Sequence, residues 1–393
     1  MSVTTSTEQV AVIARYPLRC ASETAAASLE SPFRLGPLDH MVLPFGPVDA
    51  VFVYKSPIPD ANRDNSALLE IERLQRALAL VLNYYPHLTG RLHFDPKSHR
   101  PEIVNLGMGA DLLEAQCSLR LDDIKSKPGR ILPSDLPDSG NALLPFFDST
   151  MEGVCRDPIL AIQHTRFACG SVAIGIRIHH IVCDACGFFQ FVHDLAQLYR
   201  ALEPNGRSGD DTGTPTLPSP PDICSYLRDS DSMTPEEHQA ALEYNPSSYY
   251  VDENPSTDPE TEPPAPPNQP APPPVLSRVL RFSSPKLQEL KAQATDPNGR
   301  DWISTNDALV AYLYQLTYRA RLQHLTAQGV PETTALNQLS TGIFSSINMR
   351  SPTRLNLSPR YFPNCVYCVY MYLQPEMVPS GKSPRPSTTC PMA

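Results

Sequence analysis

Hydrophobic residues recur every three to four positions over residues 68–85, and this spacing predicts an amphipathic helix. Pro86 follows directly, and its ring cannot continue a helix, so we expect the helix to end there. The same periodicity predicts helices over residues 188–202, 284–294 and 304–325. The last of these starts beside Ser304 and Thr305, either of which can cap a helix N-terminus.

Alternation of side chains over residues 172–180 predicts a β-strand with one buried face. Ile174, Ile176 and Ile178 share the apolar face, whereas Arg177 and His179 lie on the other. Further alternating segments predict strands over residues 87–95, 102–107, 276–283 and 363–373. Because helices and strands mix along the whole chain, an α/β or α+β fold is expected.

Proline content divides the chain into parts. The 393 residues include 43 prolines, about twice the usual share of ~5%. Residues 252–274 contain ten of these prolines and no Lys or Arg, a composition typical of an extended linker. The sequence therefore predicts a first domain over residues 1–203, a proline-rich connection over 204–275, a second domain over 276–373 and a disordered tail over 374–393.

The charge of the chain disfavours several classes of partner. The net charge is -10, and the 32 Lys and Arg residues form no basic run, so neither nucleic acid nor an anionic membrane is an expected partner. The N-terminus lacks the pattern of a secretory signal, and no apolar stretch approaches the roughly 20 residues that span a bilayer. Ten cysteines without an export signal favour reduced thiols, so a cytoplasmic location is expected.

The segment RIHHIVCDACGF, residues 177–188, contains the candidate for acid–base chemistry. If the strand continues to its end, His180 points into the interior and His179 to the opposite face. An imidazole in that place can act as a general base, because it titrates near neutrality. Asp184 follows four residues later, and it could orient the imidazole, pair elsewhere or cap the next helix. His180 could equally be a core residue without a chemical role.

Two Cys-x-x-Cys pairs raise the question of a metal site. They are Cys183 with Cys186 and Cys365 with Cys368. Zinc sites often use this spacing, but residues three apart in a strand face opposite sides, and the second pair lies in a predicted strand. We therefore expect no metal.

Four segments together resemble a known family. The segment HHIVCDACGF (179–188) resembles the HHxxxDG region of the CoA-dependent acyltransferase superfamily. The segments LNYYPHLTGRL (82–92), ISTNDALVAYLYQLTYRAR (303–321) and INMRSPTRLNLSPRYFPN (347–364) are similar to stretches of the plant and fungal BAHD acyltransferases. Their order and spacing extend the resemblance over most of residues 15–373. Within the family, the chain looks most similar to the fungal trichothecene 3-O-acetyltransferase-like proteins of secondary metabolism.

The resemblance implies an α/β fold of two chloramphenicol-acetyltransferase-like domains, with mixed sheets, flanking helices and a channel between them. It implies transfer of an acyl group, in particular acetyl, from acyl-CoA to the hydroxyl of a small molecule, with His180 as general base. By the same resemblance, Asp184 turns away from the pocket and pairs with Arg350, while Ser304 and Thr305 lie near CoA. Acyl-CoA is then a co-substrate, no cofactor is permanently bound, and the protein is a monomer.

The sequence also departs from the family pattern. Ala185 and Pro363 stand where the motifs carry glycine, and the family's Asp-Phe-Gly-Trp-Gly motif does not follow residue 373. The second domain is therefore expected to be incomplete. Two alternatives stay open on the sequence: a truncated, inactive member of the family, and a stand-alone condensation domain, which shares the HHxxxDG motif.

Overall fold

The structure is a computed structural model, and it describes residues 9–56, 68–124, 131–202, 214–225, 233–243, 279–296, 298 and 302–372. The chain divides into two compact units. Unit 1 comprises Met1–Tyr244 and Asn348–Tyr367, and unit 2 comprises Asn245–Ile347 and Cys368–Ala393. Residues 348–367 thus group with unit 1, whereas the sequence-based boundaries assign them to the second domain. Most of the proline-rich connection (204–275) and the whole tail (374–393) lie outside the described residues.

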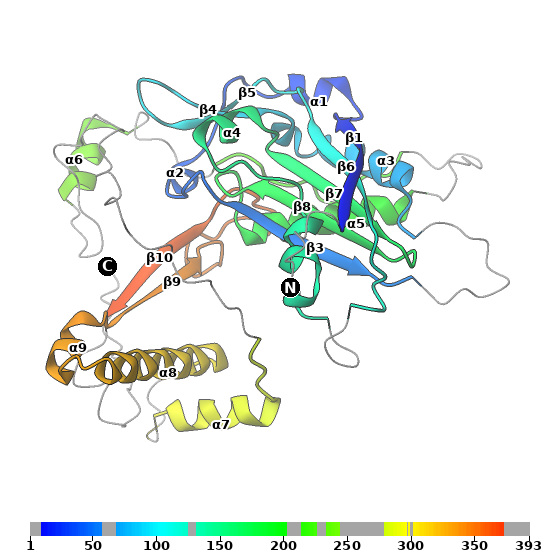
Figure 1. Ribbon diagram of the computed structural model, residues 1–393. Coiled ribbons are helices and arrows are strands. Elements are labelled where there is room, and N and C mark those ends of the chain that lie inside the picture. The colour runs from blue at the N-terminus through cyan, green and yellow to red at the C-terminus, as the bar shows by residue number, and fades with distance from the viewer. Residues whose placement is uncertain are drawn as a thin grey trace, which may run out of the picture. The chain divides into compact units, whose positions relative to one another are not determined.

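A mixed five-stranded sheet forms the centre of unit 1 (Figure 1). Its strand order is β1-β6-β7-β8-β3, with β6 and β7 parallel and the other neighbours antiparallel. Parallel neighbours need a crossover connection, and residues 118–159 provide it. The strands are β1 (Val10–Leu18), β3 (Pro47–Tyr54), β6 (Ala110–Cys117), β7 (Leu160–Phe167) and β8 (Val172–His179), and the crossover holds η3 (Pro133–Asp135), η4 (Pro137–Leu143) and α4 (Met151–Arg156).

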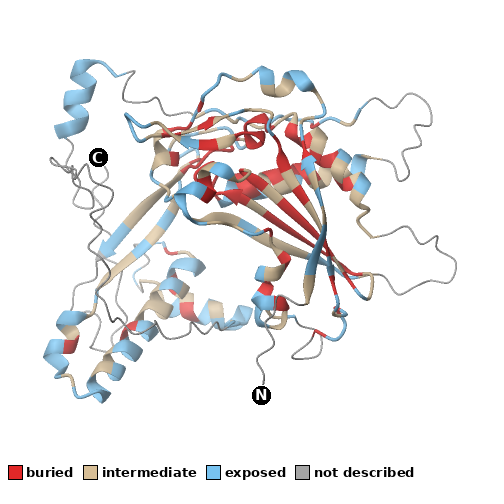
Figure 2. Ribbon diagram, turned by 45° about the horizontal axis from the view of Figure 1, so that its top comes forward, coloured by how far each residue is buried: buried red, intermediate tan, exposed pale blue. Residues whose placement is uncertain are grey.

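Two helices contribute their apolar stripes to the main core of unit 1. They are α3 (Ile71–Leu82) and α5 (Ala185–Ala201), and both confirm helices that the periodicity predicts. Leu78, Leu82, Phe188 and Phe191 are fully buried in one cluster with side chains of β7 and β8. Each such side chain stabilises the fold by about 1.5–3 kcal/mol. Figure 2 shows these buried positions concentrated along the sheet and its helices.

The second face of β8 is also buried, so the expectation of a single buried face was wrong. Ala173 lies in a second hydrophobic cluster with Leu143 and Phe167. At Gly175 a Cβ atom would collide with the backbone carbonyl of Leu143. Small residues on this face therefore let the loop around η4 pack directly against the strand, which the alternation pattern alone cannot indicate.

A smaller antiparallel sheet in unit 1 has the strand order β2-β5-β4. The strand expected over residues 87–95 starts only at Arg91, because residues 86–89 form a 3-10 turn. The remaining elements of unit 1 are short. The strands of this sheet are β2 (Phe33–Arg34), β4 (Arg91–Phe94) and β5 (Pro101–Val104). The short helices are α1 (Glu23–Ala27), α2 (Pro37–His40), η2 (Pro86–Thr89) and α6 (Pro235–Glu243).

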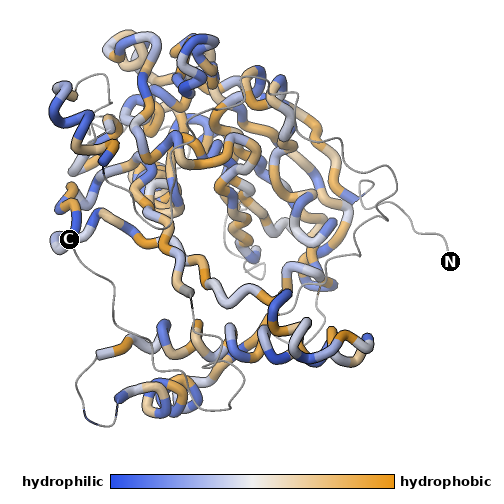
Figure 3. Tube along the Cα trace, turned by 90° about the vertical axis from the view of Figure 1, so that its left-hand side faces the viewer, coloured by the Kyte–Doolittle hydropathy of each residue, from blue (hydrophilic) through white to orange (hydrophobic). Residues whose placement is uncertain are grey.

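Unit 2 is largely helical in its described part. Its helices are α7 (Ser284–Ala294), α8 (Thr305–Ala327) and α9 (Glu332–Gln338). The paired strands β9 (Gly342–Asn348) and β10 (Val366–Tyr372) cross the boundary between the units, at residues 347/348 and 367/368. The strand predicted over residues 276–283 is absent from its described part, 279–283. Along α8, Ala308 and Tyr318 are the buried residues, and Figure 3 shows hydrophilic and hydrophobic positions interleaved along these helices. Among helices of the described ranges, none combines the length and hydrophobicity needed to cross a bilayer.

Candidate active site

His180 is the first residue after β8, and both polar groups of its backbone are held. Its N–H donates to the carbonyl oxygen of Gly46 at 3.2 Å. Its own carbonyl oxygen accepts a hydrogen bond from Nδ2 of Asn364 at 2.9 Å. The side chain is half-buried, and within the described residues its enclosed Nδ1 has no hydrogen-bond partner. The backbone hydrogen bonds hold the residue in place, while Nδ1 of the ring makes no hydrogen bond to a described protein group.

His179 is buried more deeply than His180, contrary to the expectation that only His180 faces the interior. Its side chain is 2% exposed, and its ring packs on Phe147 with ring centroids 5.1 Å apart. It lines a cavity of about 230 Å³ beside Arg177 on the second face of β8. Burial lowers the pKa of His179 to about 4. The reason for the difference is again that this face of the sheet is covered.

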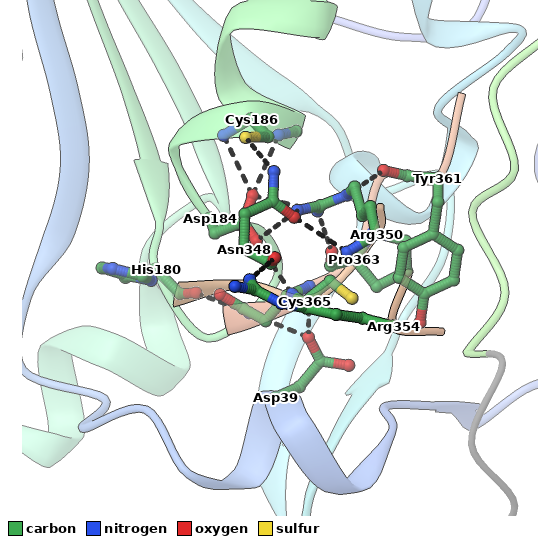
Figure 4. A network of polar contacts seen from close by, with 12 residues as sticks. Asp39, His180, Asp184, Cys186, Asn348, Arg350, Arg354, Tyr361, Pro363 and Cys365 are labelled. Atoms are coloured by element: carbon green, nitrogen blue, oxygen red, sulfur yellow. Dashed lines mark hydrogen bonds and ion pairs between the residues drawn. The ribbon is translucent and has the colours of Figure 1, made fainter. Parts of the chain in front are cut away.

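Asp184 caps α5 and pairs with an arginine at the same time. One carboxylate oxygen accepts from the backbone N–H groups of Cys186 and Gly187, at 2.9 and 3.1 Å. Arg350 donates to both oxygens, at 2.8 and 3.0 Å, and the N–H of Cys365 donates at 2.8 Å. The structure thus brings Asp184 and Arg350 together, while the ring of His180 points away from this pair (Figure 4).

Arg350 is 9% exposed and also organises its own segment of chain. Its guanidinium donates to the carbonyl oxygens of Tyr361 and Pro363, at 3.0 and 2.6 Å. These bonds connect Arg350 to later residues of the same segment of unit 1, residues 348–367, which we call the 348–367 loop. A lysine could not make all of these bonds, because its ammonium has three donors on a single nitrogen, whereas the guanidinium has five in a planar arrangement.

Further contacts fix the same loop on unit 1. Phe362 is fully buried, with its ring 4.9 Å from that of Tyr85. The carboxylate of Asp194 accepts from Tyr85 Oη at 2.6 Å and from the guanidinium of Arg360. At Gly187 a Cβ atom would collide with the carbonyl oxygen of Phe362, so this position in α5 requires glycine. Of these residues, the sequence points to those in the RYFPN stretch, but nothing in it indicates Asp194.

Ser304 and Thr305, the candidate CoA-binding residues, lie in unit 2. The Ser304 hydroxyl accepts from the N–H of Asp307 at 3.0 Å, and the Ser304 N–H donates to the Asp307 carboxylate at 2.8 Å. This reciprocal arrangement is a capping box at the start of α8. Thr305 is the first helical residue and is exposed.

The two Cys-x-x-Cys pairs are not assembled into a metal centre. Cys183 is fully buried, whereas Cys186 is exposed and its Sγ accepts a hydrogen bond from Nδ2 of Asn348 at 3.2 Å. Throughout the described ranges, no group of three or more His, Cys, Asp or Glu side chains could hold a metal ion.

The match to a family model now decides the classification. The model of the Transferase family matches residues 9–379. The chain belongs to this family, the BAHD acyltransferases.

Individual relatives agree with this membership. "Anthranilate N-benzoyltransferase protein 3" of Dianthus caryophyllus is 35% identical over 170 residues, which are 41% of this chain and 35% of that protein. "Taxadien-5-alpha-ol O-acetyltransferase" of Taxus chinensis is 32% identical over 164 residues, or 40% of this chain and 34% of that protein. These two matches thus cover only about a third of the length of each relative.

A solved structure shares the fold. TRI101 of F. sporotrichioides, complexed with coenzyme A and T-2, has a TM-score of 0.54 at 15% identity, and the match covers 89% of this chain and 71% of that one. The expected α/β fold with mixed sheets and flanking helices is confirmed.

Proposed function

We propose that this protein is an acyl-CoA-dependent O-acyltransferase that acetylates a hydroxyl group of a small secondary metabolite, with His180 as general base. The observation that carries the proposal is the placement of His180 in a BAHD-family chain. Its backbone is fixed on both sides, while its ring points away from the buried Asp184–Arg350 pair.

His180 takes the proton of the acceptor hydroxyl as the oxygen attacks the carbonyl carbon of the acyl thioester. The carbon–sulfur bond then breaks, the ester remains on the acceptor, and the imidazolium returns the proton to the CoA thiolate. No proton is gained or lost overall. A positioned base of this kind contributes about 10²–10⁴ in rate.

In this proposal Asp184 and Arg350 support the site without touching the substrates. Among the described residues, the hydrogen bonds to the Asp184 carboxylate come from Arg350 and from the backbone of residues 186, 187 and 365, so the pair connects the start of α5 to the 348–367 loop. Ser304 and Thr305 are proposed to lie along the bound CoA. The same hydroxyl of Ser304 would then serve both as a helix cap and as a contact of the co-substrate.

The names of the similar proteins guide the choice of substrates. One relative is an O-acetyltransferase, another an N-benzoyltransferase, and the solved structure holds coenzyme A and T-2. Membership of the fungal trichothecene branch rests on the sequence resemblance alone. We further propose a monomer that works in the cytoplasm, in keeping with the absence of disulfides among the described cysteines.

The test is an assay of the purified chain with acetyl-CoA and benzoyl-CoA against taxadien-5-alpha-ol, T-2 and anthranilate. Mass spectrometry would detect the acylated product, and chromatography the released CoA. Ester formation from acetyl-CoA that is lost in His180→Ala supports the proposal. Amide formation alone would replace the O-acyltransferase by an N-acyltransferase, and the absence of CoA release above a blank with every pair would count against the proposal.

A further inference from the structure

We infer that Asp39 and Asn364 form a positioning pair that holds the backbone of His180 through consecutive hydrogen bonds. This inference rests on the proposed role of His180 as general base. The sequence patterns do not implicate Asp39, which lies in a four-residue helix. Asn364 ends the RYFPN stretch, but the sequence does not indicate which groups its side chain contacts.

The geometry links three distant parts of unit 1. One carboxylate oxygen of Asp39 accepts from both the N–H and the Nδ2 group of Asn364, at 2.9 and 2.8 Å. The same Nδ2 group donates to the carbonyl oxygen of His180 at 2.9 Å (Figure 4). An amide nitrogen carries two hydrogens, so it can serve both acceptors at once.

Asp39 also decides which way the amide of Asn364 faces. With the amide reversed, its oxygen would lie against two acceptors, the Asp39 carboxylate and the His180 carbonyl. In the observed orientation, Oδ1 of Asn364 is buried without a hydrogen-bond partner in the described part of the chain. The two bonds of Nδ2 therefore outweigh the loss at Oδ1 and fix the orientation that His180 needs.

Asp39 also caps the short helix α2, but a helix cap alone does not explain why its carboxylate is buried. Its other oxygen accepts from the N–H of Gly36 at 2.8 Å, which caps α2. Asp135 makes the equivalent bond to the N–H of Leu132 at 2.8 Å while remaining partly exposed. Asp39 is 2% exposed, and burying a carboxylate is costly. Its extra partners are the two donors of Asn364, which is itself 1% exposed.

The remaining backbone contact of His180 comes from the same region of the chain. The carbonyl of Gly46, which accepts the N–H of His180, lies in the connection between α2 and β3. The segment from Asp39 to Gly46 thus contacts His180 directly at one polar group and through Asn364 at the other. Loss of either Asp39 or Asn364 should free the carbonyl of His180 and let the ring leave its position.

The experiment compares Asp39→Ala, Asn364→Ala and the double variant with Asp135→Ala as the matched control. Steady-state kinetics with acetyl-CoA should show kcat reduced at least tenfold in each single variant, with KM for acetyl-CoA changed less than threefold. The double variant should lose no more than the worse single variant, because the two residues act in series. Asp135→Ala should keep kcat within twofold. Unchanged kcat in the folded single variants, or losses that multiply in the double variant, would overturn the inference.

A second measurement does not depend on turnover. Diethyl pyrocarbonate modifies accessible histidines, and mass spectrometry follows the peptide that contains His180. Loss of the hydrogen bond to the His180 carbonyl should raise the modification rate of this peptide several-fold in Asp39→Ala and Asn364→Ala, but not in Asp135→Ala.

If Asp39→Ala does not fold, Asp39→Asn is used instead. Its modification rate should be near that of wild type, because the amide oxygen can still accept both hydrogen bonds of Asn364. Equal rates in wild type and Asn364→Ala would refute the pair.

The two proposals fail in different ways. If His180→Ala retains full turnover, the role of His180 as base is wrong, whatever the Asp39 and Asn364 variants do. If His180→Ala is inactive but the folded Asp39 and Asn364 variants match wild type in kcat and in modification rate, only the positioning pair is wrong.

Discussion

Arg350 donates hydrogen bonds to both carboxylate oxygens of Asp184, at 2.8 and 3.0 Å, although 166 positions separate the two residues in the chain. Their side chains are only 9% and 3% exposed. Two parallel hydrogen bonds between charged groups have a fixed geometry, so this contact sets where the 348–367 loop meets the start of α5. His180 lies four residues before Asp184, and its carbonyl oxygen accepts a hydrogen bond from Asn364 of the same loop.

We expect Asp184→Asn and Arg350→Ala each to destabilise the protein by about 3–5 kcal/mol, because each leaves a buried partner uncompensated. Urea unfolding of the single and double variants would give the coupling energy of the pair. Arg156 and Asp157 are the control, since their side chains are 55% and 33% exposed and exposed pairs couple by less than about 1 kcal/mol. A coupling for Asp184 and Arg350 as small as in the control would mean that Asp184 acts only as a helix cap.

The two neighbouring histidines should respond differently to truncation. His180→Ala should lower kcat by about 10²–10⁴ with little change in melting temperature, because the ring is only half-buried and acts in proton transfer. His179→Ala should lower the melting temperature, because it removes a buried ring that packs on Phe147, and should retain most of kcat. Activity within tenfold of wild type in His180→Ala would remove it from the mechanism.

His87 should limit stability in acid. It is fully enclosed, and burial lowers its pKa from 6.5 to about 3. Between these values the unfolded chain binds a proton that the folded chain does not. The contribution of His87 to the free energy of unfolding should therefore fall by about 1.4 kcal/mol per pH unit as the pH decreases from 6.5 towards 3. His87→Leu should unfold with a flatter acid dependence, whereas the exposed His238→Leu should follow wild type. Parallel curves for wild type and His87→Leu in urea unfolding from pH 7 to pH 4 would contradict this expectation.

Asp39 should have the opposite pH dependence. Burial, opposed by hydrogen bonds from Asn364 and Gly36 and aided by the charge of Asp184, raises its pKa from 3.8 to about 7. Between these values the folded chain retains a proton that the unfolded chain has lost, so this group's stabilisation declines as the pH rises. The stability deficit of Asp39→Asn relative to wild type should therefore be larger at pH 5 than at pH 7.5, as measured by urea unfolding. A deficit that does not depend on pH would show that Asp39 does not titrate in this range.

Gly187 should tolerate no side chain. A Cβ atom there would collide with the carbonyl oxygen of Phe362, so Gly187→Ala must displace the 348–367 loop or α5, at a cost of about 1–3 kcal/mol. Ala185→Gly, two residues earlier in the same helix, tests the general effect of glycine there and should cost about 1 kcal/mol or less. Thermal unfolding of the two variants would compare them. A Gly187→Ala protein as stable as wild type would show that the loop can shift freely.

Helices and motifs that depend on neighbouring residues alone could be predicted from the amino-acid sequence. The repeats that bury Leu78 and Phe191 predict α3 and α5, because a helix places every third or fourth residue on one face. The motifs around His180 and around Arg350 are likewise visible in the sequence, and they identify the family that the family model confirms.

Which segments cover each face of the sheet, and which distant side chains contact one another, became known from the folded structure. The burial of His179 depends on the loop around η4, which lies on the second face of β8 because Ala173 and Gly175 are small. Asn364 reaches the carbonyl of His180 across 184 positions, and Asp39 reaches Asn364 across 325. A hydrogen bond between such distant segments produces no repeating pattern in the sequence. It needs only one suitable side chain at the position where folding brings the two segments together.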